Sequence, residues 1–427
     1  MKHRFLNISK IDGEISLPGD KSISHRALIF SALAEGRSSI SNLADSEDVK
    51  KTIECFKALS IKIEKQDNEF IINGAGKNGF TKPDKPLYCG NSGTTARLLS
   101  GVLAVQDFPS QITGDESLSQ RPMKRIIDPL VKMGCKIKSN NGYLPLQFFP
   151  EDNIEAISYS LPVASAQVKG ATLLAGLHLE DITKVVEENS LSRDHTERML
   201  GLPVEIIGKT KTTLASSSYY PVAREYFVPG DISTAAFFIV LTLLIKNSSL
   251  LLKNISLNET RKSFLHVLIK MGADIKIEKI GESCNEPYGD IYVRSSELKN
   301  IEIKPNIIPG IIDEIPILSI AGVFAEGNFK ISGAKELRVK ESDRIKSVTM
   351  NLKKAGLDIT ENEDGFSVKG NLMNEMITFE SYEDHRIAMA FSVLSCLMKE
   401  ASLVNNFECV SVSNPQFLDQ LENIKDQ

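Results

Sequence analysis

The feature that most constrains the fold is a supersecondary pattern that recurs along the chain. Each copy reads as a short strand, a polar loop, an amphipathic helix, a break at glycine or serine, and two short strands. The 427 residues hold about six units of this size, so the sequence predicts a repeat-built α/β fold. The breaks lie at intervals of 67 to 84 residues, at Ser60, Gly134, Gly201, Gly272 and Gly356.

A second set of segments alternates with the first. These segments are apolar on nearly every side, which predicts helices buried beneath sheets, with the amphipathic helices packed around them. The five copies are Gly19–Gly36, Val163–Leu177, Gly230–Leu244, Asp313–Gly327 and Glu383–Leu397.

The sixth repeat is split between the two ends of the chain. The last helix, Pro415–Ile424, has no strands after it, and the first strands, Phe5–Ile8 and Glu14–Leu17, have no helix before them. We therefore expect the termini to lie together. One domain would hold residues 1–19 plus 230–427 and the other residues 20–229, with Pro-Gly-Asp at 18–20 and at 229–231 as the crossings. The alternative, two unrelated turns, is disfavoured by the parallel sequences that follow them.

Composition excludes several classes of protein. A net charge of -5, with 42% apolar and 25% charged residues, gives no basic bias toward nucleic acid. The six cysteines form no C-x-x-C pair and no metal-ligand spacing with histidine. The longest apolar run, near Ala235–Ile245, is too short to cross a bilayer, and the N-terminus lacks a long apolar signal region. We expect a cytoplasmic protein with no metal, nucleic-acid or membrane partner.

Cations and hydroxyls gather at the predicted starts of helices. Leu17–Arg26 places Lys21, Ser22 and Arg26 in a first turn, where free N–H groups and the helix dipole favour an anion. The alternative is an ordinary capped helix whose Lys21 and Arg26 face water. The glycine-rich stretch Cys89–Arg97 also allows an anion close to the backbone, although it is not a P-loop. Further cations at such positions are Arg121, Lys340, Arg344 and Arg386.

Two acids accompany these cations. Asp313 stands at the mouth of an apolar helix, either as its N-cap or as a functional group. Lys340 and Arg344 are expected on one face of a helix that starts there, and Glu341 between them could transfer a proton. The whole set predicts a site that clamps one or two anionic small molecules between the domains.

Six pieces of the chain, in order, resemble the EPSP synthase (3-phosphoshikimate 1-carboxyvinyltransferase) family. The resemblance implies a two-domain inside-out α/β fold, with three βαβαββ repeats in each domain and an active site in the interdomain cleft. It also implies a monomer that needs no metal or organic cofactor. The matching pieces are Leu17–Arg26, Gly90–Arg97, Gln120–Met123, Ala164–Lys169, Leu337–Arg344 and Glu383–Ala388.

The resemblance further implies a reaction of the shikimate pathway to chorismate and the aromatic amino acids. The carboxyvinyl group of phosphoenolpyruvate passes to the 5-hydroxyl of shikimate 3-phosphate through a tetrahedral intermediate, and phosphate leaves. The implied catalytic residues are Lys21, Asp313 and Glu341. Those for phosphoenolpyruvate are Lys21, Gly93, Arg121, Gln167, Arg344 and Arg386. Those for shikimate 3-phosphate are Lys21, Ser22, Arg26, Ser165, Gln167, Ser192, Arg193, Asp313 and Lys340.

Some positions depart from the family pattern. Val412 stands where many members carry a lysine, and Glu336 stands where some carry a substrate-binding asparagine. Features shared with glyphosate-tolerant members conflict with Gly93, a residue associated with sensitivity, so the response to this inhibitor stays open. Two alternatives also remain. One is a UDP-N-acetylglucosamine enolpyruvyl transferase, disfavoured because Gly114–Gln120 contains no cysteine. The other is a non-catalytic anion-binding repeat protein, which would not need Asp313 and Glu341.

Overall fold

The computed structural model describes residues 2–188 and 191–425, and the chain divides into two compact units. Unit 1 comprises Met1–Pro18, Pro229–Gly281 and Pro287–Gln427, and unit 2 comprises Gly19–Val228 and Glu282–Glu286. Each Pro-Gly-Asp turn therefore lies at a boundary between the units. The sequence analysis did not foresee the segment Glu282–Glu286. It is the tip of the hairpin formed by β16 (Asp274–Ser283) and β17 (Glu286–Arg294), and it belongs to unit 2.

Unit 2 contains three four-stranded sheets in its described residues. All three have the same pattern of pairing. The first two strands in the order given below are parallel, and the next two pairings are antiparallel. The first sheet is β14 (Glu225–Phe227), β3 (Glu35–Ser41), β5 (Glu69–Ala75) and β4 (Lys62–Gln66). The second is β6 (Leu87–Tyr88), β7 (Ser110–Thr113), β9 (Tyr143–Phe149) and β8 (Lys136–Asn140). The third is β10 (Ser158–Ser160), β11 (Thr183–Glu188), β13 (Thr210–Ala215) and β12 (Val204–Ile207).

Unit 1 also contains three sheets in its described residues, one with four strands and two with three. The four-stranded sheet is β2 (Glu14–Ser16), β15 (Ser249–Ser256), β17 and β16, in the same parallel-then-antiparallel order. The others are β18 (Phe329–Ile331), β20 (Gly365–Lys369) and β19 (Asp358–Asn362), and β21 (Thr378–Glu380), β22 (Ser402–Asn405) and β1 (Lys2–Phe5).

The first strand of the chain completes the last sheet. β1 pairs antiparallel with β22, and Ile11 forms a bridge with Lys425, so the prediction that the termini lie together is confirmed. Two details of that prediction were wrong. β1 covers Lys2–Phe5 instead of Phe5–Ile8, and β2 pairs with β15 in a different sheet.

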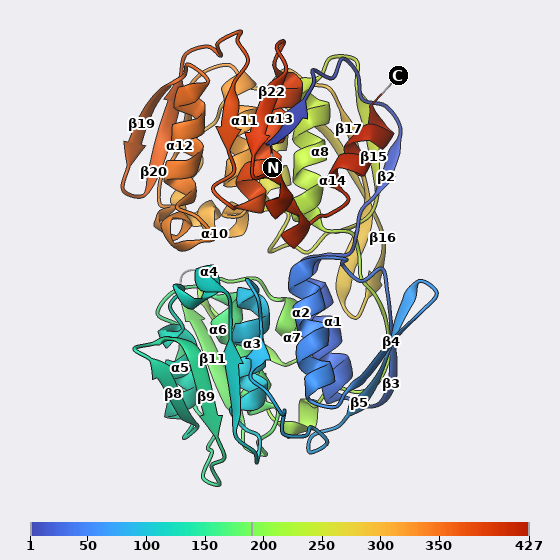
Figure 1. The fold of residues 1–427 in the computed structure, drawn as a ribbon, viewed down its shortest axis with the longest axis vertical. Helices are drawn as coiled ribbons and strands as arrows, with labels where there is room; N and C mark the ends of the chain where they lie inside the picture. Colours follow the sequence, from blue (N-terminus) through green and yellow to red (C-terminus); the bar gives the residue numbers. More distant parts are fainter. Residues whose placement is uncertain (1, 189–190, 426–427) are drawn as a thin grey trace. The chain divides into compact units, whose positions relative to one another are not determined.

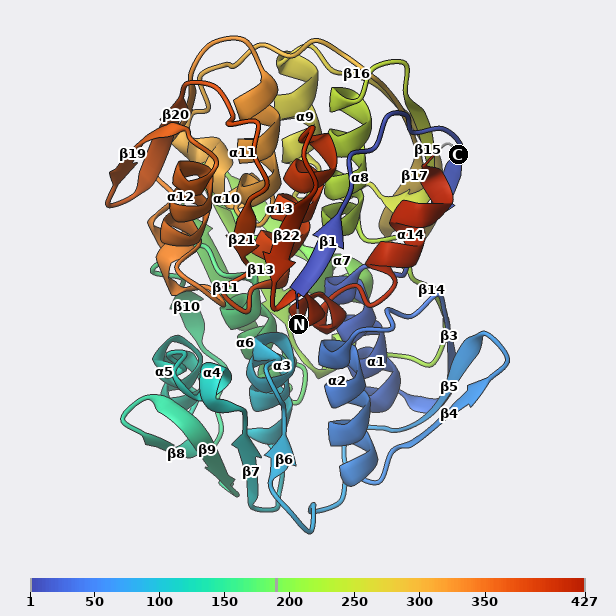
Figure 2. The ribbon, with the colours of Figure 1, turned by 45° about the horizontal axis from the view of Figure 1, so that its top comes forward.

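Six helices with few exposed residues form the centres of the units. α1 (Lys21–Leu33), α6 (Ala166–Gly176), α8 (Ile232–Leu244), α11 (Ile315–Phe324) and α13 (His385–Leu397) confirm the five apolar segments. The sequence analysis did not count α3 (Gly93–Leu103), which packs against α6 in the same way. In unit 1, α8, α11 and α13 lie side by side (Figures 1 and 2).

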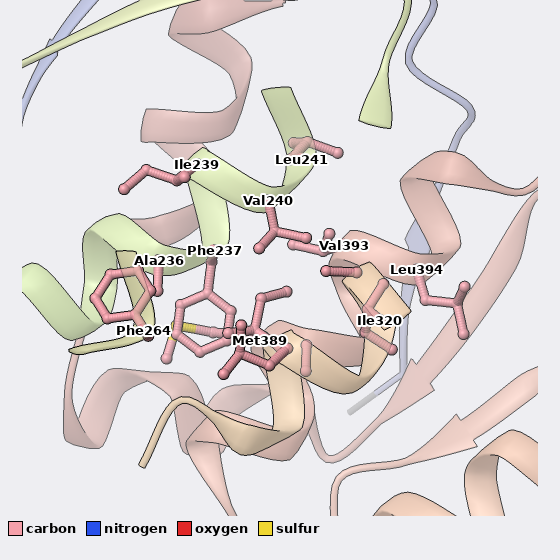
Figure 3. Close-up of a cluster of buried hydrophobic side chains, with 14 of the residues drawn as sticks. Ala236, Phe237, Ile239, Val240, Leu241, Phe264, Ile320, Met389, Val393 and Leu394 are labelled. Atoms are coloured by element: carbon pink, nitrogen blue, oxygen red, sulfur yellow. The ribbon is translucent and has the colours of Figure 1, made fainter. Parts of the chain in front are cut away.

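The core of unit 1 is built where these central helices meet. Phe237 and Val240 of α8 lie among Ile320 of α11 and Met389 and Val393 of α13, as Figure 3 shows. All five side chains are at most 1% exposed. Truncating a phenylalanine in such a core costs about 3–5 kcal/mol, because the neighbours cannot fully collapse into the cavity.

Shorter or more polar helices surround the central ones. The predicted amphipathic helices correspond to α2 (Glu47–Ala58), α5 (Lys124–Lys132), α7 (His195–Leu200), α9 (Ser263–Lys270), α12 (Arg344–Lys354) and α14 (Phe417–Ile424). Two single-turn helices are α4 (Glu116–Ser119) and α10 (Ile308–Ile311).

In each of the two Pro-Gly-Asp turns, the aspartate caps the helix that follows. The Asp20 carboxylate accepts from the Ile23 N–H at 3.0 Å and caps α1, and the Asp231 carboxylate accepts from the Ser233 N–H at 2.7 Å and caps α8. Gly19 is required before the first cap, because a Cβ there would lie 2.0 Å from the carbonyl oxygen of Asn42.

Within residues 2–188 and 191–425, no single helix has both the length and the apolar character to cross a membrane. One pair, Pro305–Ile311 and Ile315–Phe324, meets the length and composition criteria together but bends by 115°.

Candidate active site

In unit 2 the start of α1 carries Lys21, Ser22 and Arg26. Lys21 Nζ donates to Asp48 Oδ2 over 2.9 Å, and both side chains are less than one-fifth exposed. Arg26 Nη1 donates to the Ser22 carbonyl over 3.0 Å. Arg26 is 3% exposed, so the alternative of a solvated arginine at this position is wrong.

Arg26 is held from two sides in a buried position. Its Nε donates to Thr196 Oγ1 of α7 over 2.8 Å. The pKa of Arg26 is lowered to about 10, chiefly by burial and to a smaller extent by the nearby Arg193, although Glu197, Glu286 and Asp20 oppose the shift. The guanidinium therefore stays charged at neutral pH but has given up much of its hydration, which makes it a strong partner for an anion.

The starts of α3 and α6 are joined by side-chain hydrogen bonds. Arg97 Nη1 donates to Gln167 Oε1 over 2.7 Å, and Gln167 Nε2 donates to Thr94 Oγ1 over 3.0 Å. Gly93 opens α3 beside them, and a Cβ at this position would lie 2.9 Å from Arg97 Nη1 and 3.5 Å from Arg121 Nη1. Gly93, Gln167 and Arg121 thus come together, as the resemblance implied, with Arg97 as an unforeseen fourth member.

Arg121 follows α4 and is oriented by the loop before α3. Its Nη2 donates to Asn91 Oδ1 and, over 3.1 Å, to Ser117 Oγ. Its Nη1 donates to the Asn91 carbonyl over 3.4 Å. Its Nε is buried and has no hydrogen-bond partner among the residues that the structure describes.

Ser165 is the N-cap residue of α6, and Ser192 lies in the segment just before α7. Ser165 Oγ caps α6 by accepting from the Val168 N–H at 3.4 Å. The Ser192 N–H donates to Glu187 Oε1 over 2.8 Å. Ser192 Oγ is buried, and within the described parts of the chain it has no hydrogen-bond partner. A buried hydroxyl in this state is costly unless a ligand or water completes it. Arg193 follows directly and is partly exposed.

In unit 1 the carboxylate of Asp313 lies among three cations. Arg344 Nη1 donates to Asp313 Oδ1 over 3.0 Å, Lys340 Nζ lies 3.5 Å from the same oxygen, and Arg386 Nη2 lies 4.0 Å from Oδ2. Arg386 also donates to the Asp313 carbonyl over 3.2 Å. The alternative that Asp313 caps α11 is wrong, because Glu314 occupies the N-cap position.

Arg344 is the centre of this cluster. It is 2% exposed, and besides Asp313 it donates to Asp384 Oδ2 over 2.8 Å and to Glu341 Oε2. Burial alone lowers the pKa of Arg344, but Asp384, Glu341 and Asp313 together raise it above the ordinary value. The guanidinium is therefore a permanent charge, held in place by three carboxylates.

One expected geometry was wrong, although the residues do come together. Lys340 and Arg344 do not share a helix face, because α12 begins at Arg344 and Lys340 follows the short 3-10 helix Lys335–Val339. They meet instead at the carboxylate of Asp313, which comes from the segment before α11.

Sequence reasoning gave no role to several partners of the candidate residues. They are Asp48, Asn91, Arg97, Glu187, Glu314 and Asp384. Most of them lie tens of residues from the side chain that they hold, so no local pattern marks the pair. Asn91, Arg97, Glu314 and Asp384 stood in stretches that the sequence analysis singled out, but nothing there assigned them these partners. Asp384 also carried a local signal, its place as the N-cap of α13. Among the described residues, no group of three or more His, Cys, Asp or Glu side chains is arranged to hold a metal ion.

Comparison with known proteins gives a consistent result. The sequence model of the family described as EPSP synthase (3-phosphoshikimate 1-carboxyvinyltransferase) matches residues 6–421. Proteins named 3-phosphoshikimate 1-carboxyvinyltransferase from Petrotoga mobilis and Salinibacter ruber are 48% and 45% identical. The first match covers 100% of both chains and the second 97% of both.

Solved structures show the same fold. EPSP synthase from Acinetobacter baumannii superposes with a TM-score of 0.88 at 38% identity, covering 99% of this chain and 98% of that one. The enolpyruvyl transferase NikO from Streptomyces tendae is similar in fold alone, with a TM-score of 0.78 at 13% identity over 99% and 96% of the two chains. The expected α/β architecture is confirmed, and the chain belongs to the EPSP synthase family.

Proposed function

We infer that this enzyme transfers the carboxyvinyl group of phosphoenolpyruvate to the 5-hydroxyl of shikimate 3-phosphate and releases phosphate. Its family and its relatives bear the name of this activity. The observation that carries the residue-level proposal is the carboxylate of Asp313, which lies within 4.0 Å of Lys340, Arg344 and Arg386. Such a cluster offers a base and an anion-binding site in one place.

The first proposed step is proton removal from the acceptor. Asp313 takes the proton of the 5-hydroxyl as the oxygen attacks C2 of phosphoenolpyruvate. The neighbouring cations stabilise the negative charge of the incoming substrates. Lys340 and Arg344 are the members of this cluster that lie closest to the carboxylate.

The second proposed step is protonation of the vinyl carbon. Glu341, with Lys21, supplies the proton that turns the methylene group of phosphoenolpyruvate into a methyl group. A tetrahedral ketal phosphate results. It collapses when the same groups reverse their roles, a proton leaves the methyl group, and the C–O bond to phosphate breaks. The carboxyvinyl group thus ends on the acceptor oxygen, and phosphate is released.

The remaining residues are proposed to bind and orient the substrates. Each phosphate brings a charge of about -1.5 to -2, which a set of arginines matches through paired hydrogen bonds. Phosphoenolpyruvate is assigned to Lys21, Gly93, Arg121, Gln167, Arg344 and Arg386. Shikimate 3-phosphate is assigned to Lys21, Ser22, Arg26, Ser165, Gln167, Ser192, Arg193, Asp313 and Lys340. The second set is supported by the buried guanidinium of Arg26 and by the Ser192 hydroxyl, which has no partner among residues 2–188 and 191–425.

The test is phosphate release from phosphoenolpyruvate by the full chain. We expect release only with shikimate 3-phosphate, and a loss of about 10²- to 10⁴-fold in Asp313→Ala. Release with UDP-N-acetylglucosamine instead would mean that the acceptor is wrong. No release with either acceptor, despite binding of both anions, would favour a binding protein.

We also propose a cytoplasmic location and a monomeric state. All six cysteines are free thiols, which suits the reducing conditions of the cytoplasm. Resemblance to the family suggests that the enzyme acts as a monomer on its two small-molecule substrates. Light scattering of the purified protein with and without both substrates would test the second proposal.

A further inference from the structure

Four charged side chains are buried together inside unit 2. Lys169 of α6 is fully buried, and its Nζ donates to Glu187 Oε2 of β11 and to Glu197 Oε1 of α7, each over 2.7 Å. Lys211 of β13 donates to the same Glu197 oxygen over 2.9 Å. These four residues, here called the buried quartet, join four elements and carry no net charge.

The buried quartet is costly to build. Burial raises the pKa of Glu197, but Lys169 and Lys211 outweigh it and lower that pKa, so the carboxylate stays ionised. Removing charges from water costs several kcal/mol per ion, and well-packed apolar side chains often stabilise a core as well or better. Hydrogen bonds between charged groups are directional, whereas apolar contacts are not. They therefore fix the position of each partner.

Hydrogen bonds connect the buried quartet to two proposed substrate-binding residues, Ser192 and Ser165. Glu187 uses one oxygen for Lys169 and the other, Oε1, to accept from the Ser192 N–H at 2.8 Å. Lys169 in turn donates its backbone N–H to the Ser165 carbonyl over 3.0 Å. A continuous set of bonds thus links Ser165 to Ser192, and it engages the backbone of Ser192 while leaving its hydroxyl available.

A second anchor holds the same segment three residues later. His195 Nδ1 lies 2.8 Å from Glu286 Oε1, and both side chains are at most 1% exposed. Glu286 comes from the hairpin tip Glu282–Glu286, which belongs to unit 2. Ser192 and His195 are therefore each tied to a buried carboxylate, and Arg193 is presented between them.

We propose that Glu187 and Lys169 are positioning residues for shikimate 3-phosphate. They fix Ser192, and with it Arg193, relative to Ser165 and Gln167 at the start of α6. This inference rests on the proposed function, because it needs Ser192 to contact that substrate.

The first experiment compares two neighbouring glutamates of β11 in the full-length enzyme. In Glu187→Gln the side chain keeps a single acceptor oxygen and cannot serve both Lys169 and the Ser192 N–H. We expect KM for shikimate 3-phosphate to rise about tenfold or more, with kcat and KM for phosphoenolpyruvate changed less than about twofold. The matched control is Glu188→Gln at an exposed position, which should behave like the wild type.

A thermal unfolding scan of each variant separates positioning from stability. If Glu187 mattered only for folding, Glu187→Gln would lower the melting temperature and the fraction of active enzyme, and so kcat, with KM for shikimate 3-phosphate unchanged. That result would overturn the proposal. A variant that does not fold would be replaced by Glu187→Asp, which keeps the charge but shortens the reach, with the same expected rise in KM.

A double-variant cycle tests whether Glu187 acts through Ser192. Ser192→Ala alone should raise KM for shikimate 3-phosphate. The double variant with Glu187→Gln should be no worse than the more affected single variant, because a displaced segment cannot use the hydroxyl. Effects that multiply, or no effect of Ser192→Ala, would overturn the proposal. Failure of the wild type to use shikimate 3-phosphate would instead overturn the proposed function.

Discussion

Arg344 Nη1 donates to Asp313 Oδ1 over 3.0 Å, so the proposed base contacts a residue that is proposed to bind phosphoenolpyruvate. The same guanidinium is held by Asp384 at 2.8 Å. Asp384 is fully buried, whereas the side chain of Asp313 is 13% exposed. One carboxylate thus serves as the fixed anchor of Arg344, and the other remains accessible for chemistry.

Replacing Asp313 by asparagine should abolish most turnover and leave substrate binding. The amide keeps the shape but cannot take the hydroxyl proton, so we expect kcat to fall about 10²- to 10⁴-fold. Steady-state phosphate release and calorimetric binding of shikimate 3-phosphate measure the two effects. The control is Asp358→Asn at the exposed start of β19. A kcat within a few-fold of the wild type would remove Asp313 from its role as base.

Glu341→Gln should block proton transfer to the vinyl carbon. In D₂O with both substrates, wild-type enzyme should exchange deuterium into the methylene group of phosphoenolpyruvate, because addition is reversible, and the variant should not. Mass spectrometry of recovered phosphoenolpyruvate gives the readout. Glu302→Gln, at an exposed position of the same unit, is the control. Undiminished exchange in Glu341→Gln would assign the acid to another group.

Asp48→Asn should weaken catalysis through Lys21. The pair is 2.9 Å long and mostly buried, so its loss frees the ammonium from a fixed position, and we expect kcat/KM for phosphoenolpyruvate to fall roughly tenfold. The control is Asp45→Asn, which removes the exposed pair with Lys50 at 3.0 Å and should change this value less than about twofold. Equal effects of the two variants would count against a role for Asp48 in placing Lys21.

Gly93→Ala should impair phosphoenolpyruvate binding selectively. The added methyl group would lie 2.9 Å from Arg97 Nη1 and 3.5 Å from Arg121 Nη1. Both neighbours are the ends of flexible side chains, so the fold should survive while the guanidinium groups move. We expect KM for phosphoenolpyruvate to rise several-fold to about tenfold, with KM for shikimate 3-phosphate as the internal control. A parallel rise in both constants would point to general disruption.

Stability should fall in mild acid because of buried histidines. The pKa of His178 is lowered to about 4, chiefly by burial and to a smaller extent by Lys77, although the bond to the Leu174 carbonyl opposes the shift. The unfolded chain, with a pKa near 6.5, binds the proton more tightly than the folded chain. The free energy of unfolding therefore rises with pH between about 4 and 6.5, by about 1.4 kcal/mol per pH unit, and this contribution is lost as the pH falls through that window.

Urea unfolding at several pH values, followed by circular dichroism because the chain has no tryptophan, measures this slope. His178→Gln should reduce it. A residual slope should remain from His25, whose pKa is also lowered, first by burial and then by Lys21 and Arg26. An unchanged slope in His178→Gln would show that His178 contributes nothing to it.

Local patterns in the sequence determined the repeat, the buried central helices and the meeting of the termini. Apolar periodicity and capping depend on residues a few positions apart, as Asp20 and Ile23 illustrate. The order of the motifs was specific enough to indicate the family. The stretch Cys89–Arg97 was interpreted for its glycines, and α3, which it begins, was not counted among the buried segments.

Only the tertiary structure decided which side chains hold the candidate residues. Lys21 and Asp48 lie 27 residues apart, Arg97 and Gln167 lie 70 apart, and His195 and Glu286 lie 91 apart. The strength of an ion pair or hydrogen bond depends on the distance between its atoms and on their burial. Neither quantity can be inferred from the spacing of the two residues along the chain. Asp313 illustrates both what the sequence indicated and what the fold decided. The sequence marked it as an acid among cations, and the fold decided that Lys340 and Arg344 reach it from outside a shared helix face.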